Sequence, residues 1–314
     1  MMTVINYGRH IWAKTDMTDM TSTSWLSLAQ HLTDTMMVSR LLWDHWLAGK
    51  TRDWLDDALH GHGRVVLSFL AGVHDIGKCT PAFEKQASYR PDLMAMLSDN
   101  GYAIPPDLGK PGELRHETSG FFALSEWFAA NDMPLPLSRC LAIVVGGHHG
   151  VYHSRATYHD KRHKREYYGA GAWSSTRTAI IDDMASMTGF TAIMHDLDAD
   201  TITQPIQSVL TGIVVVADWI ASSAYLFPLC CMGTVTNEDA RVRRAWSAPG
   251  VHPPTIDHAT ELYIEDGKGT VKLTDTPESF SMEDRRYSGT IYSRTIIDPY
   301  SPMAFANGGN HVSH

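Results

Sequence analysis

Cysteine is scarce in this chain of 314 residues, which contains only Cys79, Cys140, Cys230 and Cys231. Their spacing fits neither the pairing of a disulfide framework nor the ligand pattern of a zinc ribbon. Cysteines without such a pattern are typical of a reducing compartment. We therefore expect a cytoplasmic protein.

Long uncharged apolar segments are also missing. The first residues, MMTVINYGRHIWAKTDMTD, contain no apolar core of the kind that marks a signal peptide. The longest apolar run, Gly212 to Ile220, is interrupted by Asp218, whereas a bilayer span needs roughly 20 largely uncharged apolar residues. The sequence thus predicts a soluble protein with no membrane partner.

Positive charge is in deficit, because 26 Lys and Arg residues stand against 35 Asp and Glu residues, for a formal net charge of −9. A chain this acidic is not expected to coat nucleic acid broadly, although a local basic path stays open. Its length and its 43% of apolar residues fit one large domain or a domain with an appendage.

Histidine, by contrast, is abundant, with 17 copies. Its imidazole is the most frequent transition-metal side-chain ligand in proteins. The histidines therefore have to be sorted by the kind of segment in which each one lies.

Helical periodicity dominates from about Ser24 to Phe227. Apolar residues within 25–32 recur at three-to-four spacing, a mostly apolar run covers 65–73, and Pro205 opens a further strong helix. These patterns predict an all-α helical bundle over residues 1–250, with polar residues at helix ends or projecting into the core.

The character of the sequence changes after Pro249. Residues 261–265 and 270–273 flank Asp266-Gly267-Lys268-Gly269, and Asp-Gly is a favoured hairpin turn. The remainder is rich in Ser, Thr, Pro and Gly. We expect residues 251–314 to form a C-terminal extension with a small β-hairpin and a loosely ordered tail.

A possible metal site begins in the segment AGVHDIGKCT, which contains His74 and Asp75. An aspartate that follows a histidine at a helix end can bridge two cations with its two oxygens. Two residues cannot complete such a site, but further polar residues stand in equally apolar surroundings. They are His31 in WLSLAQHL, His116 in ELRHET, His148 and His149 in GGHHG, and Asp218 in VVVADWIA.

Each of these residues has an ordinary structural alternative when it is considered alone. His31 or His116 could be a hydrogen-bonded core histidine, and Asp218 could be an ion-paired buried carboxylate. The double histidine could belong to a glycine-flanked turn, and His74-Asp75 could simply end a helix. The metal-site hypothesis is favoured, because without a metal all of these separate alternatives would have to be true in the same chain.

The order of these residues resembles the HD superfamily of metal-dependent phosphohydrolases. More narrowly, H-D-I-G-K-x-x-x-x-F followed by G-G-H-H-G is similar to the HD nuclease domain of the CRISPR-associated helicase-nuclease of type I systems. The resemblance covers about residues 20–250, up to the stretch Arg243-Arg244-Ala245-Trp246.

The resemblance implies a ligand set of two parts. It assigns a first metal to His31, His74, Asp75 and Asp218, and a second to His116, His148 and His149, with Asp75 as the bridge. It also implies that Lys78 lies near the scissile phosphate as a second catalytic residue beside Asp75. From the residues alone, Lys78 could equally be a solvated lysine at a helix end.

Two adjacent cations can activate a water molecule and stabilise the charge that develops on a phosphate. Ligands rich in nitrogen favour manganese, iron, cobalt, nickel or zinc over magnesium. We therefore expect a transition-metal-dependent nuclease that hydrolyses phosphodiester bonds in single-stranded DNA.

A basic, tyrosine-rich stretch, YHSRATYHDKRHKREYY, follows the double histidine. Most charge runs are solvated faces, but alternating cations and aromatic rings are also typical of a groove that holds phosphates and stacks bases. The candidate nucleic-acid contacts are Arg155, Lys161, Arg162, Lys164, Arg165, Tyr152 and Tyr158.

In members of the HD nuclease family, the chain usually continues into a helicase. The sequence contains no G-x-x-x-x-G-K-[ST] motif, so we expect no ATP site. Either single-stranded DNA then comes from a separate helicase subunit, from the RNA-guided surveillance complex Cascade, or from both, or the helicase has been lost and the tail has adapted to another partner. The C-terminal extension could dock on such a partner.

Two competing functions stay open. The first is an HD phosphohydrolase that acts on nucleotides, which needs a closed pocket that reads the base. The second is a non-catalytic, metal-stabilised subunit of a CRISPR complex. The basic tyrosine-rich stretch favours a polymer substrate over the first, and the complete ligand set argues against the second.

Overall fold

The structure of the protein is a computed structural model. It describes residues 8–16, 22–229 and 238–248, together with the backbone of three strands at 262–265, 270–273 and 290–293. The chain divides into two compact units, Met1–Ala245 and Trp246–His314. The boundary predicted at residue 250 stays a prediction.

The first unit begins with two antiparallel strands, β1 (Trp12–Thr15) and β2 (Trp25–Ser27). Helical spacing in the sequence was a wrong guide to residues 25–27, which form β2. Helix α1 (Leu28–Leu41) begins only after Ser27, because the Ser27 hydroxyl accepts a hydrogen bond from the backbone N–H of Gln30 at 3.2 Å and so caps the helix.

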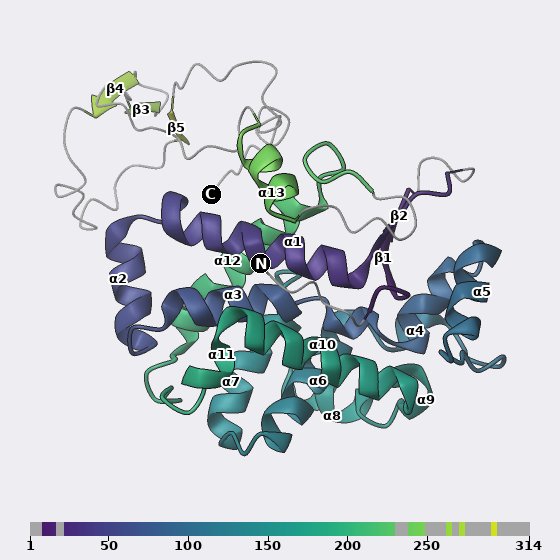
Figure 1. Ribbon diagram of the computed structural model, residues 1–314. Helices are drawn as coiled ribbons and strands as arrows, with labels where there is room; N and C mark the ends of the chain where they lie inside the picture. Colours follow the sequence, from purple (N-terminus) through teal and green to yellow (C-terminus); the bar gives the residue numbers. More distant parts are fainter. Residues whose placement is uncertain are drawn as a thin grey trace. The chain divides into compact units, whose positions relative to one another are not determined.

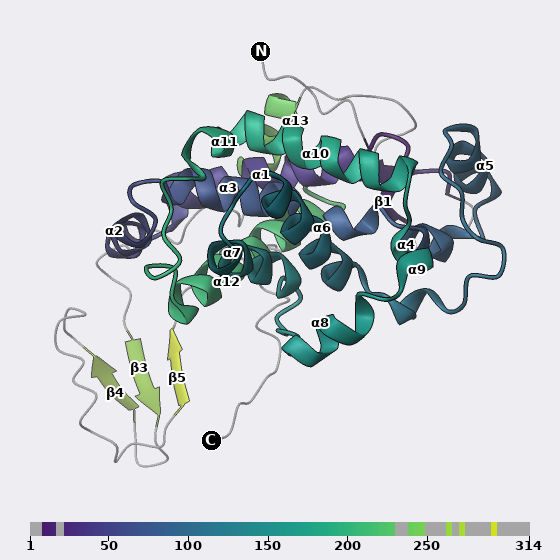
Figure 2. The same cartoon turned by 90° about the horizontal axis from the view of Figure 1, so that it is seen from below.

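Helices make up the rest of the first unit, which confirms the predicted all-α class (Figures 1 and 2). Helix α1 packs against α3 (Gly63–Val73) and α12 (Gln204–Ser222), and α6 (His116–Ala130) packs against α7 (Leu135–Gly146). These five helices position the polar residues singled out above.

Shorter helices and α10 surround this core. They are α2 (Gly49–Ala58), α4 (Pro81–Glu84), α5 (Pro91–Asp99), α8 (Arg155–Lys161), α9 (Arg165–Tyr168), α10 (Ala172–Thr188), α11 (Phe190–Ile193) and α13 (Glu238–Trp246). A π-helical turn covers Leu42–Trp46, and 3₁₀ turns cover Ile76–Lys78, Lys85–Ala87 and Pro111–Glu113.

Helix α12 begins at Gln204, with Pro205 in its first turn as predicted. By length and composition alone it could cross a membrane, but the core helix of a globular protein has the same features. Here α12 packs against α1, α3 and α7, and it carries Asp218 on the side that faces them. Its role in the first unit is therefore that of a core helix.

The second unit contains a three-stranded antiparallel sheet in the order β4-β3-β5. Strands β3 (Leu262–Glu265) and β4 (Thr270–Leu273) form the hairpin expected around Asp-Gly, and β5 (Thr290–Ser293) pairs with the other edge of β3. The hairpin prediction is confirmed, and β5 adds a strand that the sequence did not suggest. The expected loose tail lies outside the described residues.

Candidate metal centre

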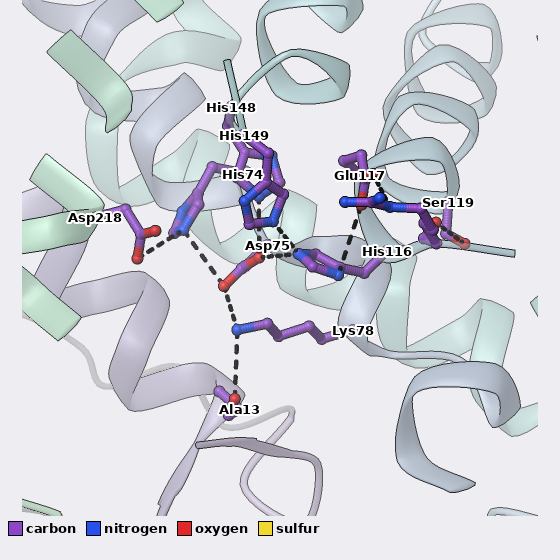
Figure 3. A network of polar contacts seen from close by, with 12 residues as sticks. Ala13, His74, Asp75, Lys78, His116, Glu117, Ser119, His148, His149 and Asp218 are labelled. Carbon is purple, nitrogen blue, oxygen red and sulfur yellow. Dashed lines mark hydrogen bonds and ion pairs between the residues drawn. The ribbon is translucent and has the colours of Figure 1, made fainter. Parts of the chain in front are cut away.

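The seven predicted ligands come together in two adjacent groups inside the helical bundle (Figure 3). The first group offers four ligand atoms and the second offers three, and within each group these atoms all lie within 4.8 Å of one another. We call them cluster 1, comprising His31, His74, Asp75 and Asp218, and cluster 2, comprising His116, His148 and His149.

Cluster 1 is supplied by three helices that pack against one another. His31 lies in the first turn of α1, His74 and Asp75 directly follow the last residue of α3, and Asp218 lies on α12. The His31 Nε2 atom is 3.0 Å from Asp75 Oδ2 and 3.2 Å from Asp218 Oδ1. Apolar helix faces thus bury a group of four polar side chains.

Cluster 2 is formed where one helix begins and another ends. His116 is the first residue of α6, and His148 and His149 follow the end of α7 at Gly146. The Nε2 atoms of His116 and His149 are 2.8 Å apart. Both rings direct the same atom at the same place, which suits a shared cation.

Asp75 lies between the clusters and divides its two oxygens between them. Its Oδ2 is 3.0 Å from His31 Nε2 and 3.4 Å from His74 Nε2. Its Oδ1 is 3.3 Å from His116 Nε2 and 3.4 Å from His148 Nε2. This is the placement that a carboxylate bridging two cations requires.

Gly77 permits this close approach of the clusters. A Cβ atom at this position would overlap the backbone carbonyl of His116 and the backbone N–H of Gly120 in α6. Only glycine lets the turn after Asp75 pack directly on the first turn of α6. The G in H-D-I-G-K therefore fixes the distance between the two ligand groups.

Two ligand rings are held in one orientation by backbone carbonyls. His74 Nδ1 lies 2.8 Å from the carbonyl oxygen of Ala71, and His148 Nδ1 lies 2.6 Å from that of Val145. Because a carbonyl only accepts, each Nδ1 donates, so Nε2 is the ring atom of each histidine that faces the centre and could hold a metal.

Within the described residues, several buried polar atoms in the centre make ion-pair contacts but no hydrogen bond of regular geometry. They are Nε2 of His31, His74 and His148, and Oδ1 of Asp75. Leaving a buried polar group unsatisfied costs about 1–3 kcal/mol each. Bound cations would satisfy all four atoms, so the residues present fit a pair of divalent metal ions.

The titration of these groups favours the ligating forms. Burial lowers the pKa of His31 and takes the pKa of His116 well below its usual value, so both imidazoles are neutral near pH 7. Burial would raise the pKa of Asp75, but Lys78 and His74 hold it well below its usual range. In the same way, His31 and His74 lower the pKa of Asp218 despite its burial.

His74 differs from the other histidines of the centre. Burial opposes its protonation, but the carboxylates of Asp75 and Asp218 outweigh burial and raise the pKa of His74 to about 9. In the metal-free protein its proton therefore balances part of the carboxylate charge. Ligand atoms must be deprotonated, so a cation would take the place of this proton.

Lys78 is buried, with 7% of its surface exposed, so the alternative of a solvated lysine at a helix end is wrong. Its Nζ atom lies 2.6 Å from Asp75 Oδ2 and donates to the carbonyl oxygen of Ala13 at 3.3 Å (Figure 3). The ammonium group therefore lies at the edge of cluster 1, and it also ties β1 to the centre.

Two further charged residues at the centre were not singled out from the sequence. The ammonium group of Lys14 on β1 lies 3.7 Å from Asp218 Oδ1. Glu117 is buried at the start of α6, and its Oε2 faces Nδ1 of the ligand His116 at 3.7 Å. Glu117 was detectable in principle, because a carboxylate often faces the outer nitrogen of a metal-bound histidine. No local signal marks Lys14.

The basic tyrosine-rich stretch forms α8, α9 and the loops around them. Lys161 donates to the backbone carbonyl of Glu113 at 2.9 Å, and Lys164 lies 3.2 Å from the Glu113 carboxylate. Tyr152 is 43% exposed and donates to Thr211, while Arg155, Arg162 and Arg165 are exposed.

Tyr158 does not fit its predicted role in base stacking. Only 8% of its surface is exposed, and its ring stacks on Phe121 with centroids 3.9 Å apart. The helical phase of α8 turns this ring into the core, which the alternating pattern of the sequence did not indicate. Neither face of the ring is open to a base.

A helical bundle that holds one His/Asp cluster and one cluster of histidines, with the aspartate of a His-Asp pair between them, is typical of the HD class of metal-dependent hydrolases. The family of the HD domain of Cas3 matches residues 12–227, which is more than half of the chain. The chain therefore belongs to the Cas3 HD domain family of CRISPR-associated nucleases.

Known proteins agree with this assignment. The chain is 28% identical over 271 residues to the CRISPR-associated nuclease/helicase Cas3 of Streptococcus thermophilus, covering 77% of this chain and 28% of that protein. It thus spans less than a third of that relative's length.

Two solved structures share the fold. The T. fusca Cas3-ATP structure matches with a TM-score of 0.59 at 23% identity, covering 78% of this chain and 27% of its own. The Thermus thermophilus Cas3 HD domain, solved in the presence of Ni²⁺, matches with a TM-score of 0.52 at 18% identity, covering 77% and 91%.

Proposed function

We propose that this protein is a metal-dependent nuclease that cleaves single-stranded DNA in type I CRISPR defence. The observation that carries the proposal is Asp75, whose two oxygens face four histidine nitrogens, two of cluster 1 and two of cluster 2, at 3.0 to 3.4 Å. The residues on either side of Asp75 would hold divalent cations, which would supply an activated water and stabilise the charge that develops on the phosphate during hydrolysis.

The residues of the chain divide the remaining work. His31 and His74 lie on the buried side of the centre, which opens to solvent at the exposed His149 and, with 17% of its side chain exposed, at Asp218. A phosphodiester therefore reaches the centre from the cluster 2 side or along its rim. The ammonium group of Lys78 lies beside Asp75. Its positive charge would stabilise the negative charge of a phosphate bound there.

The donor set suits manganese, cobalt, nickel, iron or zinc, because five of the seven ligands are imidazoles. Partners follow from the substrate rather than from the site. A nuclease for single strands needs a supplier of unpaired DNA, which we propose is a helicase together with the RNA-guided surveillance complex.

The test is cleavage of circular single-stranded DNA by the purified chain with Mn²⁺, Co²⁺ or Ni²⁺, compared with the same protein in EDTA. Circular substrate reports endonucleolytic cuts without requiring an end. We expect cleavage that Asp75→Ala and His74→Ala abolish. Equal product from the wild-type protein and both variants would refute the proposal, because it would identify a contaminating nuclease.

The two competing functions are separated in the same experiment. Turnover of deoxynucleoside triphosphates or cyclic nucleotides in preference to single-stranded DNA would establish a nucleotide phosphohydrolase. Binding of metal without hydrolysis of any of these substrates, combined with loss of thermal stability in ligand variants, would establish a structural metal site.

A further inference from the structure

A second cationic side chain reaches the metal centre from β1. Lys14 donates to the hydroxyl of Ser222 on α12, and its ammonium group lies 3.7 Å from Asp218 Oδ1. The Lys14 side chain is 23% exposed, whereas that of Lys78 is only 9% exposed. Of these two lysines at cluster 1, Lys14 is therefore the one that solvent reaches more freely.

The position of Lys14 is fixed by the contacts of its strand. The backbone N–H of the neighbouring Trp12 donates to the buried Glu84 carboxylate at 3.4 Å, and its indole N–H donates to the Glu84 carbonyl at 3.5 Å. Lys78 donates to the carbonyl of Ala13. These contacts, at the two residues that precede Lys14, hold β1 beside the centre.

A large aromatic side chain lies exposed next to the same ligand. Trp219 directly follows Asp218 on α12, and 71% of its surface is exposed. Residues three apart on a helix are neighbours on its surface, with Cβ atoms about 5–6 Å apart. Trp219 is therefore adjacent to Ser222, the residue to which Lys14 donates.

Exposed aromatic rings are the platforms on which proteins stack the bases of single-stranded nucleic acid. The neighbouring lysine favours an anionic occupant, and the adjoining centre is proposed to act on phosphodiesters. A flat indole offers its face to an unpaired base, which a duplex does not present. Together these features favour a single strand of nucleic acid.

We propose that Lys14 and Trp219 form a strand-binding rim on the cluster 1 side of the centre. Lys14 contacts a backbone phosphate next to Asp218, and Trp219 stacks on the base of an adjoining nucleotide. This inference rests on the proposed nuclease function and names contacts for its substrate. It moves part of the binding surface from the predicted tyrosine-rich stretch, where Tyr158 is buried, to β1 and α12.

The experiment measures binding of a fluorescein-labelled oligothymidine by fluorescence anisotropy in EDTA, over a series of salt concentrations. The full chain is compared with Lys14→Gln, Lys14→Arg, Trp219→Ala and Trp219→Phe. The matched controls are Lys50→Gln and Trp54→Ala on α2, because both residues are exposed and neither belongs to the centre. Thermal melting of each variant establishes that it is folded.

The two side chains have distinct expected signatures. Trp219→Ala should weaken binding about tenfold without changing the salt dependence, and Trp219→Phe should restore most of the affinity. Lys14→Gln should make the slope of log affinity against log salt shallower by about 0.7, the change expected for one lost phosphate contact to a single strand. Lys14→Arg should keep the wild-type slope.

Variants of Lys14 and Trp219 that bind like the controls, in a wild-type protein that binds and cleaves DNA, would overturn the rim and leave the nuclease function intact. A wild-type protein that neither binds nor cleaves single-stranded DNA would overturn both. A protein partner on Trp219 would show as unchanged DNA binding by Trp219→Ala, which also counts against the rim.

Discussion

Cluster 1 and cluster 2 differ in how the fold holds them, although Asp75 belongs to the surroundings of both. His31 and His74 of cluster 1 have fully buried side chains and come from packed helices of the core. In cluster 2, His116 is 18% exposed and His149 is exposed, and all three histidines lie at helix ends. The core thus encloses cluster 1 except at Asp218, whose side chain is 17% exposed, whereas cluster 2 has His148 buried and opens to solvent at His149.

The difference teaches how one centre can combine a fixed and an accessible part. Packing prevents the cluster 1 ligands from moving apart, so a cation there should be retained tightly. The open side of cluster 2 leaves room for water and a phosphate to reach a second cation. We expect the two halves to respond differently to mutation, and the following predictions test that expectation.

Replacement of Asp75 should have the largest effect, because its carboxylate serves both clusters. Asp75→Ala should abolish cleavage and reduce bound metal below one ion per chain by elemental analysis. In EDTA it should also lower the free energy of unfolding by about 3 kcal/mol, since Lys78 loses the partner of a buried ion pair. Two retained metal ions would contradict the bridging role.

Gly77→Ala should separate the clusters. The added methyl group overlaps backbone atoms of α6, which have to shift, so we expect a loss of about 1–3 kcal/mol in unfolding free energy. Metal analysis should show one ion retained at cluster 1. Gly112→Ala is the control, because no atom lies within 4 Å of the new Cβ. Equal behaviour of the two variants would contradict the packing argument.

One ligand from each cluster can be compared directly. His74→Ala should remove the tightly held cation, and His149→Ala should leave it while weakening the second site by more than about 100-fold, a larger effect than loss of an outer-sphere partner. Calorimetric titration with Mn²⁺ measures both sites. If His149→Ala loses both ions, the clusters are not separable.

Glu117 offers a finer change at cluster 2. Glu117→Gln should weaken metal binding there by about 10–100-fold, because the carboxylate that faces His116 Nδ1 is neutralised. Cluster 1 should be unaffected in the same titration. The control on the same helix is Glu126→Gln, whose carboxylate instead accepts from Tyr168. A weakened cluster 1 would mean that Glu117 acts through the fold.

Glu84 tests the core beside cluster 1 without touching a ligand. Burial raises the pKa of Glu84 well above its usual value, so the folded protein binds a proton more tightly than the unfolded chain. That contribution is complete below the unfolded pKa and is lost as the pH rises toward the folded pKa. The free energy of unfolding of Glu84→Gln, relative to that of the wild type, should therefore increase from pH 4 to pH 8 in urea titrations. Of the variants considered, this one should change the metal content least.

Much of the centre could be predicted from the sequence because its ligands stand out locally. His74-Asp75 at the end of an apolar run, and Gly-Gly-His-His-Gly after another, are visible without a structure. The strand at 25–27 was missed because its apolar residues also fit helical spacing, and the cap at Ser27 decided the outcome. The burial of Tyr158 was missed because alternation alone does not give the phase of a short helix.

The sequence by itself indicated the helical class, through short-range periodicity, and seven candidate ligands, through polar residues in apolar surroundings and their resemblance to the HD family. Tertiary structure alone decided which oxygen of Asp75 faces which cluster, how Glu117 faces His116, and that Lys14 meets Ser222. The reason is physical: Lys14 and Ser222 are 208 positions apart, and only the packing of β1 beside α12 brings them into contact.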